Sequence, residues 1–314
     1  MRVFGPVPSR RLGSSLGINN IPPKVCTYSC IYCQIGKTIT LQCDRQAFYG
    51  PDDLAREVKE KVYEVRKSNI TIDYLSFVPD GEPTLDSNLG TIIERIRPLR
   101  IKIAVISNGS LINRRDVRED LQKADLVSLK VDAATRKTWL RTDRPHKSLD
   151  QKAILDGMLE FKAMFKGEII TETMLCKGMN DAEQEVKKIA DFLKLLKPAK
   201  SYISIPTRPT AVKGILPASD EALNIAYQIL TLNVDNVEYI IGYEGNEFGL
   251  SGNVEEDLLG ITSVHPMREE AVREYLKKAG ADWRVITDLI KSGSLIEVKY
   301  QGKNFYMRKL PSKA

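Results

Sequence analysis

Three cysteines lie within eight residues, at Cys26, Cys30 and Cys33, and their spacing is C-x3-C-x2-C. Thiolates are soft ligands that suit iron–sulfur clusters, zinc or copper(I). A [4Fe–4S] cluster normally takes four cysteine ligands, so a set of three leaves one iron open to a substrate or cofactor. The spacing therefore predicts a [4Fe–4S] cluster bound by these three residues.

A structural zinc site and a disulfide are the two alternatives to a cluster. Zinc usually takes four ligands in two separated pairs, and the two histidines, His146 and His265, lie far from the cysteines. Disulfides are uncommon inside cells, and the first residues lack the apolar stretch of a signal peptide. We therefore expect a cytoplasmic protein with reduced thiols. Of the remaining cysteines, Cys176 is expected in the core and Cys43 as a free thiol.

Length and composition are typical of a globular protein with one large and one small domain. The chain has 314 residues, and 42% of them are hydrophobic, which is enough to form a buried core. It contains no apolar run of the length that a membrane-spanning helix needs. We therefore expect no contact with a membrane.

From about residue 70 to 245, short β-branched runs alternate with longer helical stretches, which predicts an α/β fold with parallel strands. A further strand is expected before Cys26, and Asp181 is expected to cap a helix. The predicted strands are 72–78, 101–106, 126–131, 169–175, 202–205 and 237–241, and the predicted helices are 52–67, 88–97, 116–123, 152–165, 181–196 and 220–231.

Polar, glycine-rich and proline-rich segments follow five of these strands. In β/α barrels the active residues lie on loops at the carboxyl ends of the strands. Five such loops in one chain indicate an enzyme more than a structural protein. The segments are 79–84, 107–109, the single residue Asp132, 177–181 and 206–209.

The cysteine motif resembles that of the radical S-adenosylmethionine (radical SAM) superfamily. More closely, residues 1 to about 245 resemble the archaeal and bacterial proteins grouped with wyosine tRNA-base synthases. The resemblance implies a partial (β/α)6 barrel of the TIM type over residues 1–250. The segments that carry it are 7–13, 21–36, 77–85 with its Gly-Glu-Pro core, 172–175 and 205–209.

The resemblance also implies a reaction. In this superfamily an electron donor, commonly a flavodoxin or ferredoxin, reduces the cluster, whose open iron binds the amino and carboxylate groups of S-adenosylmethionine (SAM). Reductive cleavage of the sulfonium gives methionine and a 5′-deoxyadenosyl radical, which abstracts hydrogen from a substrate. The cofactor performs this chemistry, and the protein supplies orientation and excludes water.

Site residues follow from the matched positions. Tyr32 is the aromatic residue that commonly precedes the last cysteine. Gly81, Glu82 and Pro83 match the segment that binds the methionyl amino group, and a carboxylate such as Glu82 suits an ammonium. Asn108 and Asp132 match ribose contacts, whereas residues 174–178 and 205–207, which include Thr207, match adenine contacts.

Two basic residues have an open role in this part of the chain, and two of its features differ from the family pattern. Arg10 and Arg11 are expected to pair with a carboxylate or phosphate, or to form an exposed basic pair. Asp80 takes the place of the first glycine in the family's Gly-Gly-Glu segment, where the backbone is therefore less free. Wyosine synthases carry additional N-terminal cysteines for a second cluster, and this chain has none before Cys26.

The last part of the chain predicts a separate module. Residues 251–257 are expected to form a linker, and 258–314 a winged-helix domain with a hairpin at 296–308. Residues 266–314 contain eleven Lys or Arg and six Asp or Glu, a balance of +5 in a chain of net charge +6. A basic excess at one end is typical of contact with RNA or DNA, which would here involve Arg284, Lys291, Lys299, Lys303, Arg308 and Lys309. The alternative is an ordinary solvated surface on a module that only packs against the barrel.

Three hypotheses about function remain open. The chain is a radical SAM enzyme acting on RNA or another large anion, a radical SAM enzyme acting on a small metabolite, peptide or protein, or an iron–sulfur regulator that binds DNA and senses redox state. The polar strand ends favour an enzyme over a regulator. The sequence does not separate the first two hypotheses.

Overall fold

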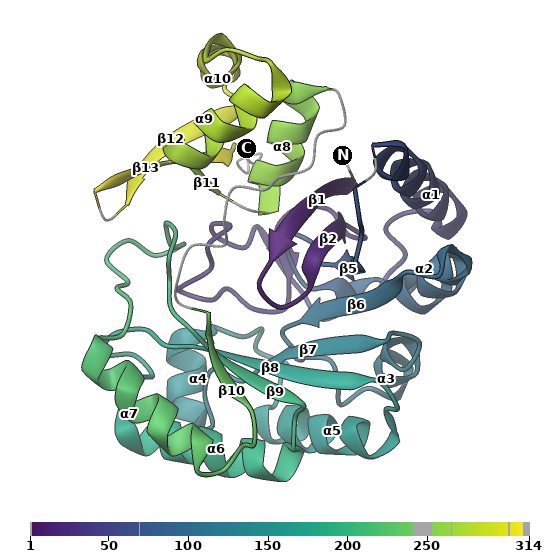
Figure 1. Cartoon of the computed structure of the whole chain (residues 1–314). Coiled ribbons are helices and arrows are strands. Elements are labelled where there is room, and N and C mark those ends of the chain that lie inside the picture. Colours follow the sequence, from purple (N-terminus) through teal and green to yellow (C-terminus); the bar gives the residue numbers. More distant parts are fainter. Residues whose placement is uncertain (1, 69, 241–252, 265, 301, 310–314) are drawn as a thin grey trace.

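The computed structural model describes residues 2–68, 70–240, 253–264, 266–300 and 302–309 (Figure 1). It contains a large α/β unit and a smaller unit formed by the last described residues. In these ranges, no helix has both the length and the apolar character that crossing a membrane requires.

The large unit is built on a curled sheet of eight strands in the order β1-β2-β5-β6-β7-β8-β9-β10 (Figure 1). Only the pair β1 and β2 is antiparallel, and all later neighbours are parallel. This arrangement confirms the predicted partial barrel. The strands are β1 (Val3–Ser9), β2 (Gly13–Ile18), β5 (Tyr74–Phe77), β6 (Lys102–Ser107), β7 (Leu126–Lys130), β8 (Glu168–Met174), β9 (Lys200–Ser204) and β10 (Val237–Ile240).

Helices connect the parallel strands and cover the convex face of the sheet (Figure 1). Parallel neighbours need such crossovers, because a short hairpin cannot return the chain to the same edge. The helices of this unit are α1 (Pro51–Lys67), α2 (Leu89–Ile96), α3 (Arg115–Leu121), α4 (Arg136–Thr142), α5 (Gln151–Met164), α6 (Glu183–Leu196) and α7 (Asp220–Thr231), with short 3-10 turns η1 (Pro83–Leu85) and η2 (Arg97–Leu99).

Two details of the helices differ from the sequence prediction. Asp181 does not cap α6, because its carboxylate accepts a hydrogen bond from the amide of Gly178 at 2.8 Å and closes the preceding turn. Ala182 occupies the capping position instead. Helix α4 was not predicted; Thr135 caps it by accepting from the amide of Thr138.

Side chains alternate between the two faces of the sheet. Leu75, Val105 and Val127 point toward the helices and join the main apolar core. The opposite, concave face is apolar near the amino ends of the strands and becomes polar toward the carboxyl ends, where Lys130 and Glu172 lie. The period of two in a strand therefore carries charged side chains into the barrel interior.

The smaller unit has its own core and its own antiparallel sheet, in the order β11-β13-β12. Gly280, at φ +66°, ends α9, because glycine accepts this left-handed conformation. The element order is the one expected of a winged helix, and that assignment stays a prediction. The elements are α8 (Val254–Val264), β11 (Met267–Arg268), α9 (Glu269–Ala279), α10 (Arg284–Lys291), β12 (Leu295–Tyr300) and β13 (Lys303–Arg308).

The expected linker 251–257 is wrong over its described part. Helix α8 begins at Val254, and the Asn253 side chain accepts a hydrogen bond from the amide of Glu256 at 3.3 Å. The acidic residues that suggested a linker instead form the first turn of a helix, where negative charge is favourable. Asp257 is buried and accepts a hydrogen bond from the Tyr275 hydroxyl at 2.9 Å. Residues 251 and 252 lie outside the described ranges.

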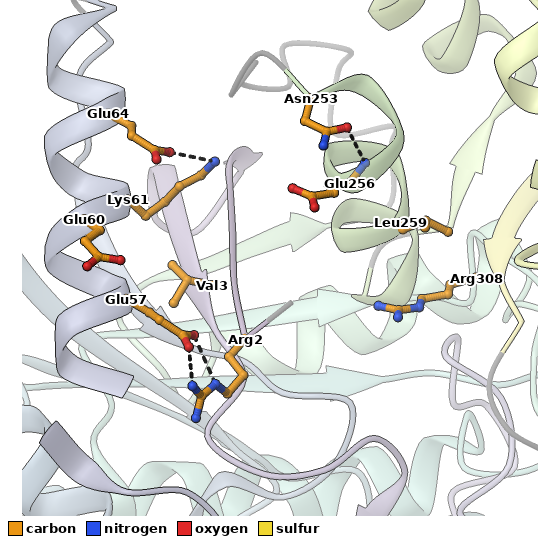
Figure 2. Close-up of a pocket in the computed structure, with 10 residues that line it drawn as sticks. All are labelled: Arg2, Val3, Glu57, Glu60, Lys61, Glu64, Asn253, Glu256, Leu259 and Arg308. Carbon is orange, nitrogen blue, oxygen red and sulfur yellow. Dashed lines mark hydrogen bonds and ion pairs between the residues drawn. The ribbon is translucent and has the colours of Figure 1, made fainter. Parts of the chain in front are cut away.

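The two units meet at several contacts, which include an ion pair between Lys61 of α1 and Asp257 of α8, with 3.9 Å between Lys61 Nζ and Asp257 Oδ1. Val7 of β1 packs against the core of the smaller unit, and α8 lies beside β1 (Figure 1). The Tyr300 hydroxyl, at the end of β12, donates a hydrogen bond to the carbonyl of Pro206, which follows β9. Between α1 and α8 the units enclose a cleft of about 690 Å³ (Figure 2).

Candidate active site

The cysteine loop follows β2 and contains a small parallel ladder of its own. β3 (Val25–Cys26) pairs with β4 (Thr40–Leu41), so Cys26 ends a strand. The chain then turns tightly, and the amide of Cys33 donates to the carbonyl of Cys30 at 3.2 Å. All three thiols are reduced, and their residues are partly buried. One loop thus presents three soft donors.

The surroundings of Cys26 and Cys30 favour the protonated thiol when no metal is bound. Burial raises the pKa of Cys26 to about 12, and the Glu82 carboxylate acts in the same direction. Burial also raises the pKa of Cys30. A compensating cation is close, because Lys24 Nζ lies 3.7 Å from Cys33 Sγ. Metal binding here would release protons, since metals bind thiolates.

The donor set fits a [4Fe–4S] cluster. Across the described ranges, no three His, Cys, Asp or Glu side chains gather closely enough to hold a single metal ion. A cubane cluster makes a different demand, because each cysteine binds a different iron. Lys24 and Asn108 also offer N–H donors to the sulfurs, the latter at 3.7 Å from Cys26 Sγ. Hydrogen bonds to sulfur are one way a protein tunes such a cluster.

Gly81 lies where the loop after β5 passes closest to the cysteine loop. A β-carbon built on Gly81 would stand 1.9 Å from the carbonyl oxygen of Val25. The amide of Glu82 donates to this same oxygen at 3.1 Å. Only glycine permits so close an approach. Pro83, which is buried, then begins η1. The contact of this segment with SAM stays a prediction.

The Glu82 carboxylate joins the ends of two strands. One oxygen accepts from the amide and hydroxyl of Thr84, at 3.1 and 2.6 Å, and from the Ser107 hydroxyl at 2.7 Å. The other accepts from the amide of Asn108 at 2.7 Å. Burial raises the pKa of Glu82, and these donors oppose that effect. Its bonds within the protein were not foreseen, and its predicted bond to an ammonium would be an additional one.

Asn108 faces the cysteine loop. Its amide nitrogen donates to the Thr27 hydroxyl at 2.8 Å as well as pointing to Cys26 Sγ, and its side-chain oxygen accepts from the amide of Ser110 at 2.9 Å. Asn108 therefore fixes the position of the loop after β6 against the cysteines. Its predicted contact with a ribose stays a prediction.

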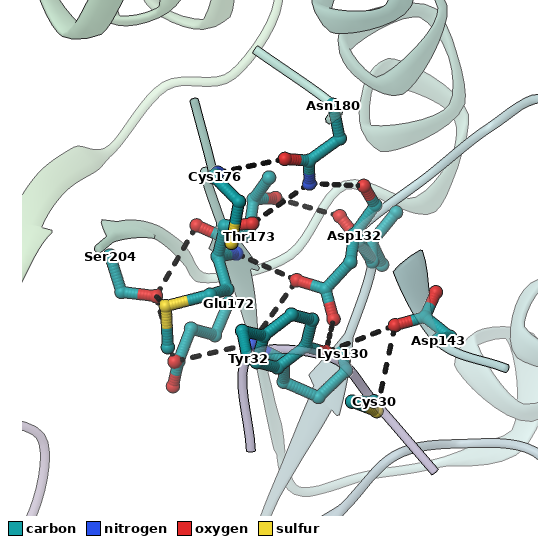
Figure 3. Close-up of polar contacts among 12 residues, drawn as sticks. Cys30, Tyr32, Lys130, Asp132, Asp143, Glu172, Thr173, Cys176, Asn180 and Ser204 are labelled. Carbon is teal, nitrogen blue, oxygen red and sulfur yellow. Dashed lines mark hydrogen bonds and ion pairs between the residues drawn. The ribbon is translucent and has the colours of Figure 1, made fainter. Parts of the chain in front are cut away.

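Tyr32 and Asp132 belong to one buried network (Figure 3). The Tyr32 hydroxyl donates to the carboxylate of Asp132 and to Asp143 Oδ1, the latter at 3.0 Å. Asp143 also lies 3.7 Å from Cys30 Sγ. Burial, together with the charge of Asp132, holds the pKa of Asp143 well above its usual range. The network thus connects the cysteine loop to the end of β7.

Lys130 and Glu172 balance charge on the concave face. Lys130 Nζ lies 3.2 Å from oxygens of both Asp132 and Glu172. Arg11 forms an ion pair with Glu172, which realises the carboxylate partner predicted for it. Burial acts to raise the pKa of Glu172, but Lys130 and Arg11 outweigh it and lower that pKa to about 2. The Ser204 hydroxyl donates to the same carboxylate at 2.9 Å.

The predicted adenine segments lie beside the same loop. The amide of Thr207 donates to Gln34 Oε1 at 3.1 Å, which attaches the loop after β9 to the cysteine loop. Cys176 is fully buried against Ile31 and Met174, as expected of a core residue. Contacts of these segments with adenine stay predictions.

Three charged residues of this site were missed by sequence reasoning: Lys24, Lys130 and Asp143. Lys130 carried a signal, because a lysine inside a predicted buried strand must face a polar interior. Lys24 and Asp143 carried none that could be recognised from one sequence. Arg308, expected on a nucleic-acid surface, lines cavities at the seam between the two units.

Comparison with known proteins agrees with this geometry. The family model of the radical SAM superfamily matches residues 20–193. A UPF0026 protein of Methanocaldococcus jannaschii is 47% identical over 99% of this chain and 97% of its own length. A UPF0026 protein of Helicobacter pylori is 36% identical over 70% of this chain and 71% of its own.

Solved structures share the fold at low sequence identity. The structure of TYW1 with a lysine–pyruvate adduct bound has a TM-score of 0.56 and 16% identity, covering 71% of this chain and 76% of TYW1. A radical SAM methyltransferase from Sphaerobacter thermophilus has a TM-score of 0.53 and 16% identity, over 72% and 66% of the two chains. This chain belongs to the radical SAM superfamily and to the family of UPF0026 proteins.

Proposed function

We propose that this enzyme binds a [4Fe–4S] cluster through Cys26, Cys30 and Cys33 and cleaves SAM reductively to begin radical chemistry on a substrate. The observation that carries the proposal is the cysteine loop itself, with three reduced thiols and two N–H donors to sulfur in a chain of the radical SAM superfamily. When bound, the cluster supplies the electron for cleavage of the sulfonium, and a flavodoxin or ferredoxin is the proposed donor to the cluster.

The chain's own residues would bind the cluster, offset its charge and position the loops around it. The thiols hold the cluster, and Lys24 offsets the negative charge that builds up on it. Glu82 and Asn108 keep the loops after β5 and β6 against the cysteine loop. The ion pair of Lys130 and Glu172 gives the concave face fixed charges, which suits control of a reactive radical.

Anaerobic reconstitution followed by product analysis tests this proposal. The loaded protein should contain about four irons per chain, by the stoichiometry of this cluster type, and should release 5′-deoxyadenosine with dithionite and SAM. Purified protein that holds zinc and takes up no iron would overturn the cluster. A full, reduced cluster that yields no 5′-deoxyadenosine would favour the redox-sensing regulator instead.

We further propose that the substrate is RNA, bound through the basic face of the smaller unit. Four basic side chains are exposed on α10 and the β12–β13 hairpin: Arg284, Lys291, Lys299 and Lys303. The contact between Tyr300 and the Pro206 carbonyl supports the idea that an anion on this hairpin would be held near the strand ends. A small metabolite or a protein is the alternative substrate.

Titration of tRNA and duplex DNA against the full protein at several salt concentrations tests the RNA proposal. Replacing Lys299 and Lys303 with glutamate should reduce the salt dependence of log K by about 0.7–0.9 for each lost phosphate contact. Replacing the exposed Lys277 and Lys278 of α9 with glutamate is the control of equal charge. Equal effects of both double variants, or no binding at low salt, would favour a metabolite or protein substrate. Preference for duplex DNA would favour the regulator.

A further inference from the structure

Asp80 carries a buried carboxylate that no hydrogen bond satisfies. Its side chain is 2% exposed, and neither oxygen has a partner among the described residues. Burying an unpaired carboxylate is costly, so such a group needs a partner in a ligand, an ion or bound water. Burial raises the pKa of Asp80 to about 7, although Lys24 and Arg308 act in the opposite direction.

Asp80 lines a cavity of about 230 Å³ at the seam between the two units. Asn19 lines the same cavity, and its side-chain oxygen is also buried without a partner. Two unsatisfied acceptors in one cavity require donors from whatever occupies it. No cysteine lines this cavity.

A cation of the protein also lines the cavity. Arg308 of β13 lines it, and its guanidinium makes no hydrogen bond or ion pair with the residues that the structure describes. Arg2, which also lines the cavity, is committed elsewhere: it pairs with Glu57 and stacks over the Tyr49 ring, 4.9 Å from its centroid. Arg308 therefore offers an anion a partner, whereas Asp80 offers a cation one.

The larger cleft between α1 and α8 adjoins this cavity, because Arg2 and Arg308 line both (Figure 2). Four glutamates and three basic residues, Arg2, Lys61 and Arg308, line it, so its walls are of mixed charge. Figure 2 shows the acidic residues of α1 on one wall and that of α8 on the other: Glu57, Glu60, Glu64 and Glu256.

We propose that this seam cavity binds a small amine that also carries an acid group, with its ammonium against Asp80 and Asn19 and its acid against Arg308. The ammonium supplies the donors that the two acceptors lack, and the acid pairs with the guanidinium. Because the cavity joins residues of the barrel to β13, the ligand would couple the two units. The inference goes beyond SAM cleavage and does not depend on it.

Three probes of equal chain length test the proposal on the reconstituted protein: 4-aminobutanoate, butylammonium and butanoate. Ligand-observed NMR should give millimolar dissociation constants for the two amines, as expected for molecules this small. The zwitterion should bind about tenfold more tightly than butylammonium, which is the value of one added ion pair in a partly buried site. Butanoate alone should not bind measurably.

Variants identify the two ends of the site. Asp80→Asn should weaken both amines by about tenfold or more. Arg308→Gln should reduce the affinity for 4-aminobutanoate to that for butylammonium, and should leave butylammonium unaffected. Asp191→Asn, an exposed carboxylate on α6, is the matched control and should change neither constant.

Several outcomes would overturn the proposal. The ammonium subsite is ruled out if neither amine saturates the protein. It is also ruled out if Asp80→Asn leaves the affinity for the amines unaltered. Asp80-dependent binding of Mg²⁺ in place of the amines makes this a metal site. SAM carries an amino acid end itself, so its affinity is measured with and without saturating 4-aminobutanoate. Independent binding supports a separate site, and competition assigns the cavity to SAM.

Discussion

Two buried carboxylates, two residues apart in the sequence, differ in the number of hydrogen bonds that they accept. Glu82 accepts four hydrogen bonds and ties two strand ends together. Asp80 accepts none. The first belongs to a strand-end site in which the polar groups already have partners, and the second to a cavity that needs something from outside. A closed hydrogen-bond network positions residues, whereas an open one indicates where a ligand is missing.

The largest effect should come from the cysteine loop. Changing Cys26, Cys30 and Cys33 together to alanine should abolish iron uptake and 5′-deoxyadenosine release, because no ligand remains. Iron analysis and the visible spectrum after anaerobic reconstitution measure the loss. Cys43→Ala should keep the cluster, since the loop does not use that thiol. Retained iron in the triple variant would place the cluster elsewhere.

Glu172→Gln should destabilise the fold by about 3 kcal/mol at neutral pH, the value of lowering a carboxyl pKa from about 4.3 to about 2. Since the folded pKa is depressed, this stability is present above about pH 4.3 and is lost as the pH falls toward 2. Urea unfolding of the wild type and the variant at pH 7 and pH 3 should therefore show that the difference between their free energies of unfolding is smaller at pH 3. An equal difference at both pH values would mean that the variant loses stability through altered packing and not through the loss of charge.

Glu82→Gln should lose about 2 kcal/mol of folding stability, because the amide nitrogen would face the Asn108 N–H, or one of the other donors, and leave it unsatisfied. It should also weaken SAM binding by roughly ten- to a hundredfold if the charge-assisted bond to the ammonium exists. Denaturant unfolding and SAM titration separate the two effects. Lost stability with unchanged SAM affinity would restrict Glu82 to positioning the strand ends.

Asp80→Asn should have the opposite sign, a gain of up to about 4 kcal/mol at pH 8, the value of raising a carboxyl pKa from about 3.9 to about 7. The pKa of Asp80 in the folded protein is about 7, above the unfolded value near 3.9. Its carboxyl therefore penalises folding increasingly as the pH rises between those values, and the gain should vanish near pH 4. Thermal unfolding at pH 4 and pH 8 measures it. A loss of stability at pH 8 would show that Asp80 already has a partner.

Much of the scaffold was predictable, because local patterns encode it. The β-branched runs located the parallel strands from β5 to β10, and the cysteine spacing located the loop that carries the site. The partners inside the barrel were not predictable, since Arg11 and Glu172 are 161 residues apart and meet only through sheet order. The linker predicted over residues 254–257 was wrong for a physical reason, because acidic residues are common both in linkers and in the first turn of a helix. The place of Arg308 depended on how the two units dock, which no local pattern records.

The Val7 and Tyr300 contacts lie toward opposite edges of a sheet that never closes into a full ring. Val7 belongs to edge strand β1, and Pro206, the partner of Tyr300, follows the strand next to the other edge. The smaller unit therefore bridges the open side of the partial barrel. It joins regions near the two edges of the open sheet and thereby limits how far those edges can move apart.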